Sequence, residues 1–301
     1  MKTEILITGG NGFLGSHLVG RLLEDDNISL ILIHREKSSF QRLLSHPKFA
    51  SLIRYNLDSS TIEEIFSKHQ IKCIIHVATE YGRHNPSPSK ILETNLILPI
   101  KLIETGVKYG LEVFINTDSY FNKDNFSYTS LLDYSLSKKS LNIWLKYFSK
   151  RVKIVNLVLE HIFGESDSSD KFVESMIQKI AVQKVSSVDL THGHQKRDFI
   201  YVKDVVEAYV KVVDFAFKNK FTYKVFEVGT GHSIQIAQLV LLIKEISQSS
   251  TDLIFGKLPY RSDEIMDSFA DTSELENLGW SPSHQLESAL RNILKKYTER
   301  K

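Results

Sequence analysis

The sequence predicts an α/β protein: a doubly wound parallel sheet, followed by a second, smaller α+β domain. Three observations predict this fold class. A glycine-rich turn directly follows the first apolar run, apolar runs then alternate with amphipathic segments, and past Gly164 the segments become shorter and more mixed. Continuous apolar strands that alternate with helices are typical of a parallel sheet covered on both faces.

The elements are expected in the following order. Strands should form at the apolar runs Ile5–Ile7, Ile28–Ile33, Ile71–Val77, Val113–Ile115 and Val152–Leu159. Amphipathic helices should form between them, near residues 13–24, 61–69, 89–109 and 134–149. Past Gly164 we expect strands near residues 198–202 and 224–228, and helices near residues 170–184, 204–217, 234–246 and 285–297. We therefore expect one domain over residues 1–160 and another over residues 161–301, some segments of which return to pack on the first.

Size and composition exclude several classes of protein. With 301 residues, 42% of them hydrophobic and 25% charged, the chain can bury a full core. The 38 Lys and Arg nearly balance the 36 Asp and Glu, so charge gives no reason to expect binding to nucleic acid or to an anionic membrane. No apolar run approaches the ~20 residues that cross a membrane, and the first residues form a strand rather than a signal peptide. Its single cysteine, Cys73, lies in a strand and can form no intrachain disulfide, so we expect a cytoplasmic protein.

The turn Thr8–Gly15 has the pattern of a dinucleotide-binding site. Gly10-x-Gly12-x-x-Gly15 connects the first strand to a helix, where glycine allows a tight turn and a close approach of backbone N–H groups to a pyrophosphate. The first domain is therefore predicted to be a Rossmann domain. Expected contacts with the cofactor are Gly9, Gly12, Phe13, Leu14 and Gly15.

The ends of the next strands indicate which cofactor binds. Where NAD-binding folds carry an acidic residue, the second strand ends in His34-Arg35-Glu36. The Arg35 cation can pair with a 2′-phosphate, so we predict NADPH rather than NADH, while Glu36 leaves NAD as the alternative. Further expected contacts, at the ends of the third and fourth strands, are Asn56, Leu57, Ala78 and Thr79.

Tyr134 and Lys138 form the predicted catalytic pair. Residues four apart share one face of a helix, so the two side chains can converge. A free tyrosine titrates near ~10, and a neighbouring ammonium and the oxidised nicotinamide would lower that pKa. Lys138 can also hold the nicotinamide ribose. The hydroxyl that polarises the substrate is expected at Thr117, with Ser119 as the alternative, because both leave the fifth strand on the same side.

Together these residues resemble the extended short-chain dehydrogenase/reductase family, the NAD(P)-dependent nucleotide-sugar epimerases, dehydratases and reductases. The resemblance covers nearly the whole chain. Thr8–Gly15 matches the family's TGxxGxxG turn, and Tyr134 and Lys138 match its YxxxK pair. Two later segments, Gln195–Val205 and Leu278–Pro282, match its RDF(I/V)xVxD block and its LGWxP ending.

Finer segments are similar to one branch of that family, the CDP-abequose and CDP-paratose synthases. These segments lie at residues 78–85, 116–119, 159–164, 170–172 and 255–266. The resemblance implies that Arg197 and Arg261 contact the substrate diphosphate and that Asn95 lies near the cofactor. It also implies substrate contacts at Glu80, Tyr81, Gly82, Arg83, Glu160, His161, Lys171 and Phe172.

The resemblance implies an NADPH-dependent reductase of the C4 ketone of a nucleotide-linked 4-keto-deoxysugar, most simply CDP-4-keto-3,6-dideoxyglucose, in O-antigen biosynthesis. Ser119 stands where the 4,6-dehydratases carry their glutamate base, which disfavours dehydration. The alternatives are a nucleotide-sugar 4-epimerase with tightly held NAD and a cofactor-binding sensor without turnover. No metal site is predicted. The helices near residues 89–109 and 134–149 carry apolar residues on more than one face, and in the family such helices pair, so a homodimer is expected.

Overall fold

The computed structural model describes residues 2–82, 86–123 and 131–298. The chain divides into two compact units. Among the described residues, the first unit holds residues 2–123, Leu131–Val158 and Ala208–Phe226, and the second holds Leu159–Glu207 and the chain from Glu227 onward. One stretch from late in the sequence therefore belongs to the first unit.

The first unit is built on a seven-stranded sheet with the order β11-β6-β5-β4-β1-β2-β3. Strands β1, β2, β3, β4 and β5 pair in parallel register along this order. The seven strands are β1 (Thr3–Thr8), β2 (Ile28–His34), β3 (Ile53–Asn56), β4 (Ile71–His76), β5 (Val113–Ser119), β6 (Lys153–Leu159) and β11 (Tyr223–Val228). The predicted doubly wound α/β fold is confirmed.

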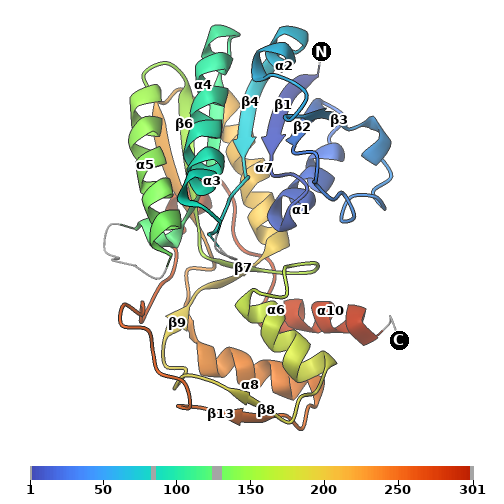
Figure 1. The fold of residues 1–301 in the computed structure, drawn as a ribbon, viewed down its shortest axis with the longest axis vertical. Helices are drawn as coiled ribbons and strands as arrows, with labels where there is room; N and C mark the ends of the chain where they lie inside the picture. Colours follow the sequence, from blue (N-terminus) through green and yellow to red (C-terminus); the bar gives the residue numbers. More distant parts are fainter. Residues whose placement is uncertain (1, 83–85, 124–130, 299–301) are drawn as a thin grey trace. The chain divides into compact units, whose positions relative to one another are not determined.

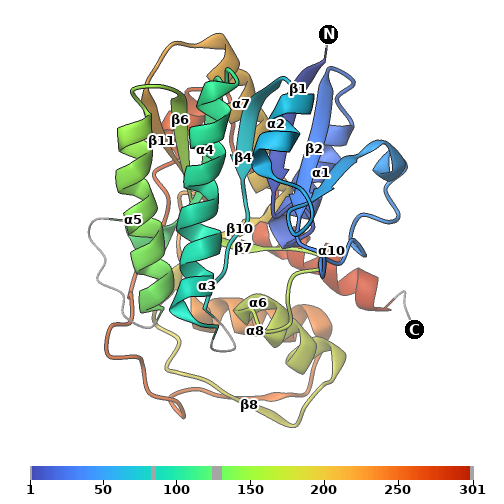
Figure 2. The ribbon, with the colours of Figure 1, turned by 45° about the horizontal axis from the view of Figure 1, so that its top comes forward.

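Helices cover both faces of this sheet. Figures 1 and 2 show α2, α4 and α5 on one face and α1 and α7 on the other. Their bounds are α1 (Phe13–Leu23), α2 (Ile62–Lys68), α4 (Leu98–Lys108), α5 (Leu132–Phe148) and α7 (Val202–Lys218). Short helical turns are η1 (Phe49–Ser51), α3 (Pro88–Leu92) and η3 (Tyr120–Asn122). The core between the sheet and α2, α4 and α5 contains the buried apolar side chains of Phe66, Ile103, Phe114, Leu141 and Leu145.

Two predicted helices contain a wider turn than expected. The helix near residues 89–109 is interrupted by η2 (Glu93–Ile97), and the helix near residues 170–184 consists of α6 (Phe172–Met176) and η4 (Ile177–Val182). Both η2 and η4 are π-helical. Such turns are frequent at functional sites because they redirect a side chain, and η2 contains Asn95.

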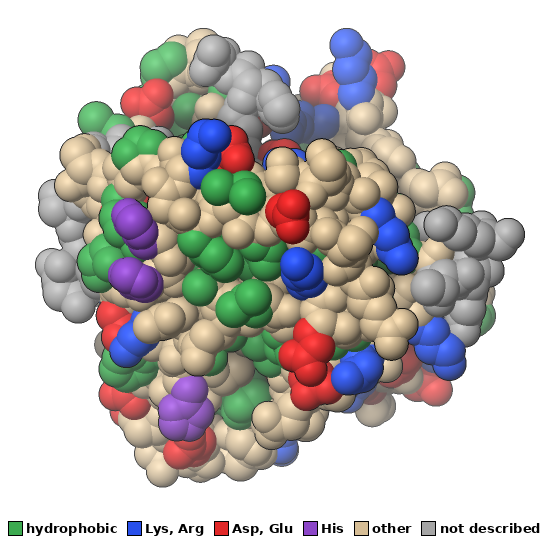
Figure 3. All heavy atoms as spheres, turned by 90° about the horizontal axis from the view of Figure 1, so that it is seen from below, with side chains coloured by type: hydrophobic (Ala, Val, Ile, Leu, Met, Phe, Trp, Pro, Cys, Tyr) green, Lys and Arg blue, Asp and Glu red, His purple; other side chains and the backbone are tan. Residues whose placement is uncertain are grey.

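The second unit has short strands in pairs. Strands β7 (His161–Phe163) and β10 (Phe199–Tyr201) pair in parallel, as do β8 (Ser187–Asp189) and β13 (Asp252–Ile254). Strands β9 (Lys196–Arg197) and β12 (Ile234–Gln235) pair antiparallel. The helices that follow in the chain are α8 (Ile236–Ser247), α9 (Ser273–Glu276) and α10 (Leu286–Thr298). Figure 3 shows side chains of both charges mixed on one face, with apolar side chains between them.

One strand joins the large sheet from late in the sequence. The strand near residues 224–228 is β11, and it pairs with β6 at the edge of that sheet. The hydrophobic pattern predicts that a strand exists and does not say which edge it joins. None of the helices in the described ranges is both long and apolar enough to cross a membrane.

Candidate active site

The turn after β1 has the backbone shape that a pyrophosphate site requires. Gly9 has φ +67°, and a Cβ there would lie 2.5 Å from the backbone nitrogen of Ala78. A Cβ at Gly15 would lie 2.1 Å from the carbonyl oxygen of Gly9. Only glycine fits these two places, and helix α1 begins between them, at Phe13. The first turn of a helix offers N–H groups without intrahelical partners, so this cradle fits a dinucleotide.

Polar contacts fix the neighbouring strand end. The Thr8 hydroxyl accepts a hydrogen bond from the Ala78 N–H at 3.1 Å and lies 2.9 Å from His76 Nδ1. Burial, with a smaller effect of Lys138, holds the pKa of His76 well below its usual value, so the ring is neutral. His76 is fully buried and stacks on Phe114. This histidine therefore supports the strands, and Ala78 and Thr79 follow it at the carboxyl edge of β4.

The predicted 2′-phosphate site lies at the ends of β2 and β3. The Arg35 side chain is exposed, and the Arg35 N–H donates to Ser38 Oγ at 3.2 Å. The Leu57 N–H donates to the carbonyl of His34 at 2.8 Å, which ties the two strand ends together. Asn56 ends β3 and turns the chain by accepting from the Asp58 N–H at 3.0 Å. Arg35, Asn56 and Leu57 therefore come from one edge of the first unit.

Three successive turns of α5 meet three consecutive residues of β5. Tyr134 hydrogen-bonds Ser119. Lys138 Nζ donates to the carbonyl oxygen of Thr117 at 2.7 Å. Asn142 Nδ2 donates to Asp118 Oδ2 at 2.6 Å. The helix period places residues 134, 138 and 142 on one face, and that face is joined to the end of the strand.

Burial sets the protonation of the catalytic pair. It raises the pKa of Tyr134 well above its usual value; the Tyr81 phenol adds to this effect and the hydrogen bond from Ser119 opposes it. Burial also lowers the pKa of Lys138 to about 8, while the Asp118 carboxylate opposes that shift. The expected lowering of the Tyr134 pKa is therefore wrong for the protein by itself, because desolvation of the phenolate is the larger effect. Tyr134 carries its proton at neutral pH.

The two candidate hydroxyls have different partners. The Thr117 hydroxyl lies 2.6 Å from the phenol oxygen of Tyr209 on α7. Ser119 instead bonds Tyr134 and accepts from the Phe121 N–H at 3.4 Å. The sequence favoured Thr117, whereas this geometry favours Ser119 as the hydroxyl beside the phenol.

Asn95 holds the segment after β4 against α5. Its amide oxygen accepts from the Glu80 N–H at 2.8 Å, and its Nδ2 donates to the Glu80 carbonyl at 2.8 Å and to Ser137 Oγ at 2.9 Å. The adjacent Tyr81 ring stacks on Tyr134 with the ring centroids 5.1 Å apart. Asn95 is fully buried in these contacts, so the structure gives it a positioning role. Gly82 follows with φ +76°.

The last predicted residue of that segment, Arg83, lies outside the described residues.

In the second unit, Arg197 is buried and already paired. Its guanidinium donates to Glu264 at 2.5 Å, to the carbonyl of Lys196 at 2.7 Å and to the carbonyl of Ile265. The adjacent Asp198 accepts hydrogen bonds from residues 230, 231 and 270.

The other predicted substrate residues differ in exposure. The Glu160 carboxylate is buried, and both of its oxygens accept from Ser268 Oγ at 2.9 Å. His161 is partly exposed beside it, and burial lowers its pKa. Lys171 and Phe172 begin α6, with Phe172 exposed, and Arg261 is exposed. Arg261 lies three residues before Glu264, which binds Arg197.

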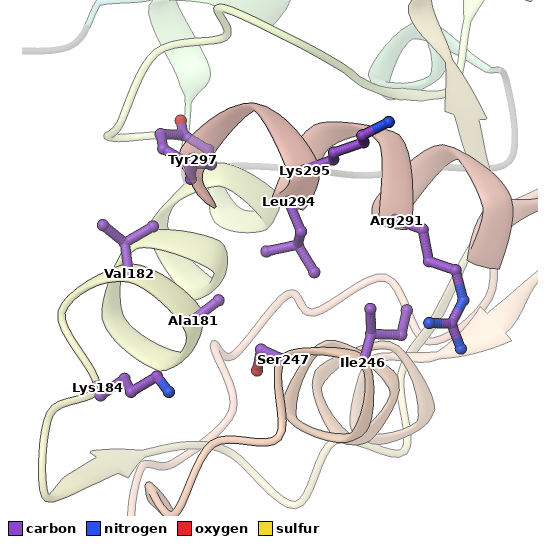
Figure 4. A pocket seen from close by; sticks show the side chains of 9 residues that line it. All are labelled: Ala181, Val182, Lys184, Ile246, Ser247, Arg291, Leu294, Lys295 and Tyr297. Carbon is purple, nitrogen blue, oxygen red and sulfur yellow. The ribbon is translucent and has the colours of Figure 1, made fainter. Parts of the chain in front are cut away.

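A hollow of about 400 Å³ lies elsewhere in the second unit, between η4, α8 and α10 (Figure 4). Its lining is Ala181, Val182, Lys184, Ile246, Ser247, Arg291, Leu294, Lys295 and Tyr297. None of the predicted site residues lines it.

Sequence reasoning missed several residues that the structure brings to the site. Asn142 and Asn156 surround Asp118, Tyr209 binds Thr117, and Glu264 binds Arg197. The i+8 spacing from Tyr134 was a signal for Asn142. The other three come from distant parts of the chain and carry no local signal.

The chain is similar to known proteins in both sequence and fold. The sequence profile of the NAD dependent epimerase/dehydratase family matches residues 5–229. A CDP-abequose synthase of Salmonella muenchen is 35% identical over 298 residues, which cover 98% of each chain. A second one, of Salmonella typhimurium, is 31% identical over 98% of this chain and 99% of the relative. The structure is similar to that of a UDP-glucose 4-epimerase from Thermotoga maritima, with a TM-score of 0.83, 24% identity and 99% of each chain covered.

Proposed function

Because the chain belongs to the NAD dependent epimerase/dehydratase family, we propose that it reduces the C4 ketone of a nucleotide-linked 4-keto-deoxysugar with NADPH. The proposed substrate is CDP-4-keto-3,6-dideoxyglucose and the product CDP-abequose or CDP-paratose, a precursor of O-antigen. The observation that carries this proposal is the placement of Tyr134 beside Ser119 and one helical turn before Lys138, whose Nζ bonds the end of β5. The similarity to two CDP-abequose synthases supports the choice of substrate.

The residues divide the reduction between them. NADPH, when bound on the glycine turn, supplies the hydride. Ser119 orients the ketone oxygen, and Tyr134 gives its proton to the alkoxide that forms there. A buried phenol with a raised pKa is protonated at neutral pH, which is the state that a reduction requires. Lys138, fixed by the Thr117 carbonyl, holds the nicotinamide ribose.

The surroundings of Asp118 argue against dehydration. In the 4,6-dehydratases the two acidic residues at this place act as acid and base, and here the second is Ser119. The Asp118 carboxylate is buried and accepts hydrogen bonds from three asparagine side chains and one backbone N–H. A carboxylate so enclosed cannot reach a substrate proton.

In this proposal, arginine side chains bind both the 2′-phosphate of NADPH and the diphosphate of the nucleotide sugar. The exposed Arg35 contacts the 2′-phosphate of NADPH, and Ser38 lies beside it. Arg197 and Arg261 contact the diphosphate of the nucleotide sugar. Because Glu264 occupies Arg197 in the protein alone, the diphosphate competes with that carboxylate for the guanidinium.

The substrate itself provides the direct test. We expect the purified protein to oxidise NADPH when CDP-4-keto-3,6-dideoxyglucose is added, followed by the absorbance of the reduced nicotinamide. CDP-glucose, which has no C4 ketone, is the control and should give no oxidation. NADH should be used more slowly than NADPH. An absence of NADPH oxidation by folded protein with the keto sugar would contradict the proposal.

The second candidate is a nucleotide-sugar 4-epimerase. The similarity to the structure of a UDP-glucose 4-epimerase favours it, because the fold is shared over 99% of the chain. An epimerase recycles its cofactor and is expected to retain NAD through purification. Release and identification of the bound nucleotide distinguishes this candidate from a reductase with exchangeable NADPH.

We also propose a homodimer built on α4 and α5. Large apolar side chains on α5 are exposed, with exposed fractions of 52% for Leu136, 72% for Ile143 and 45% for Trp144. Exposed apolar side chains that gather on one helix mark an interface. We expect Ile143→Glu to convert the dimer to a monomer in light scattering, whereas Lys211→Glu, at an exposed position of α7, should leave it a dimer. A monomeric parent protein would contradict this proposal.

A further inference from the structure

Asp118 is a buried carboxylate enclosed by four donors. Its Oδ1 accepts from the Ser119 N–H at 2.8 Å and from Asn122 Nδ2 at 2.7 Å. Its Oδ2 accepts from Asn142 Nδ2 at 2.6 Å and from Asn156 Nδ2 at 2.8 Å. The exposed fraction of the residue is 4%. Four donors on one buried carboxylate stabilise its charged form.

The amides around it are oriented for a charged acceptor. A carboxylate only accepts, so each amide must turn its nitrogen toward Asp118. The amide oxygens of Asn122 and Asn142 are then buried without a hydrogen-bond partner among the described residues. Asn116 extends the cluster, since its Nδ2 donates to Asn156 Oδ1 at 2.7 Å. Leaving buried acceptors unpaired costs free energy, which is compensated only if the group at residue 118 is a strong acceptor.

The cluster lies directly behind the catalytic pair. Lys138 donates to the carbonyl of Thr117, the residue before Asp118. Ser119, which Asp118 holds by its backbone N–H, is the partner of Tyr134. The carboxylate therefore touches the strand end, and through Asn142 it touches the same helix face as the catalytic residues.

We propose that Asp118 is the positioning residue of this site: it locks the end of β5 to α5 and is the counter-charge of the buried Lys138 ammonium, which bonds the residue before it. The role of the aligned groups rests on the proposed function. The placement of the carboxylate beside Lys138 does not, so it can be tested without any turnover.

The charges that face Lys138 are few. Asp118 favours the ammonium, and burial disfavours it. His76 is neutral, and Tyr134 is protonated, for the reasons given above. Tyr223 also lies near Asp118, and burial raises its pKa to about 12. Among the groups that act on Lys138, Asp118 is therefore the one that favours its ammonium form.

The experiment is an NMR titration of the full chain labelled with ¹³C at lysine Cε. The Lys138 signal is assigned by its loss in Lys138→Met. In the parent protein we expect it to titrate near pH 8. In Asp118→Asn, which keeps the volume and removes the charge, we expect the Lys138 pKa to fall by about one unit. Asp133→Asn removes an exposed carboxylate of the same helix and should leave the titration in place.

A second variant separates charge from packing. Asn142→Leu removes one donor and keeps the Asp118 charge, so stability should fall while the Lys138 pKa stays where it is. This variant also decides the question if Asp118→Asn does not fold. The proposal is overturned if the Lys138 pKa is unchanged in folded Asp118→Asn, or if it moves as far in Asn142→Leu. Neither outcome bears on which sugar the enzyme reduces.

Discussion

Two buried aspartates, one in each unit, are held in different ways. Asp118 in the first unit accepts mostly from asparagine side chains, which come from η3, from α5 and from β6. Asp198 in the second unit accepts from the backbone N–H groups of Thr230, Gly231 and Ala270, at 2.8, 3.0 and 3.2 Å. The Thr230 hydroxyl adds a fourth bond at 2.7 Å.

The two aspartates therefore have different structural roles: Asp118 aligns regular elements, and Asp198 supports loops. Side-chain donors around Asp118 join regular elements, so they keep a helix and a strand in register beside the catalytic pair. Asp198 directly follows Arg197 in the sequence, and its backbone donors fix the loop after β11 and the segment before α9. Under the proposed function, this difference predicts that the first unit carries the chemistry and the second holds the ligand. If that division is right, substitutions in the two regions affect different kinetic constants.

The largest effect is expected from Tyr134→Phe in the first region. Loss of the proton donor should lower kcat by roughly 10²–10⁴-fold. The ring and its stacking on Tyr81 remain, so the dissociation constant for NADPH should change little. Steady-state kinetics and fluorescence titration measure the two quantities.

Tyr147→Phe is the matched control, because Tyr147 lies exposed on the same helix. Its kcat should equal that of the parent protein. If the Tyr134→Phe enzyme kept most of its kcat, the first region would not carry out the chemistry as proposed.

A smaller effect is expected from Arg197→Met in the second region. Loss of the charged donor to a diphosphate should raise KM for the nucleotide sugar by on the order of 100-fold. NADPH affinity should not change. Lys196→Met, one residue earlier and exposed, is the control. A weakened NADPH affinity with an unchanged KM for the nucleotide sugar would contradict the assignment of different roles to the two regions.

The smallest effect is expected from Asp198→Asn, and it depends on pH. Burial raises the pKa of Asp198 in the folded protein. The folded state then holds this proton more tightly than the unfolded state, so the stabilisation is complete below the unfolded value and is lost as pH rises through the folded one. The variant lacks this dependence. It should be less stable than the parent by about 1–2 kcal/mol, with the difference smaller at pH 7 than at pH 4.

Urea unfolding at several pH values checks the sign. A difference that grows with rising pH would show that the backbone donors outweigh burial at Asp198, and the two aspartates would then be equivalent.

Local patterns were sufficient to predict most of the fold. The alternation of apolar runs and helices predicted the doubly wound sheet, and the glycine turn predicted the cradle at Gly9 and Gly15. Tyr134 and Lys138 were predicted to share a face because the helix period places them there.

The remaining features depend on partners distant in sequence. Thr117 and Ser119 share a side of β5, and the choice between them is made by Tyr209 and Tyr134, which sequence spacing does not reveal. The partner of Arg197 is likewise remote, at Glu264. The direction in which the Tyr134 pKa shifts follows from burial, and a sequence motif does not reveal burial.

The position of β11 has a consequence for biosynthesis. The edge of β6 pairs with a strand that ends at Val228, so it stays open until that strand has left the ribosome. An open strand edge can pair with another nascent chain. A fragment that stops at residue 160 is therefore expected to aggregate, and the order of translation makes this enzyme dependent on its late residues to protect its early ones.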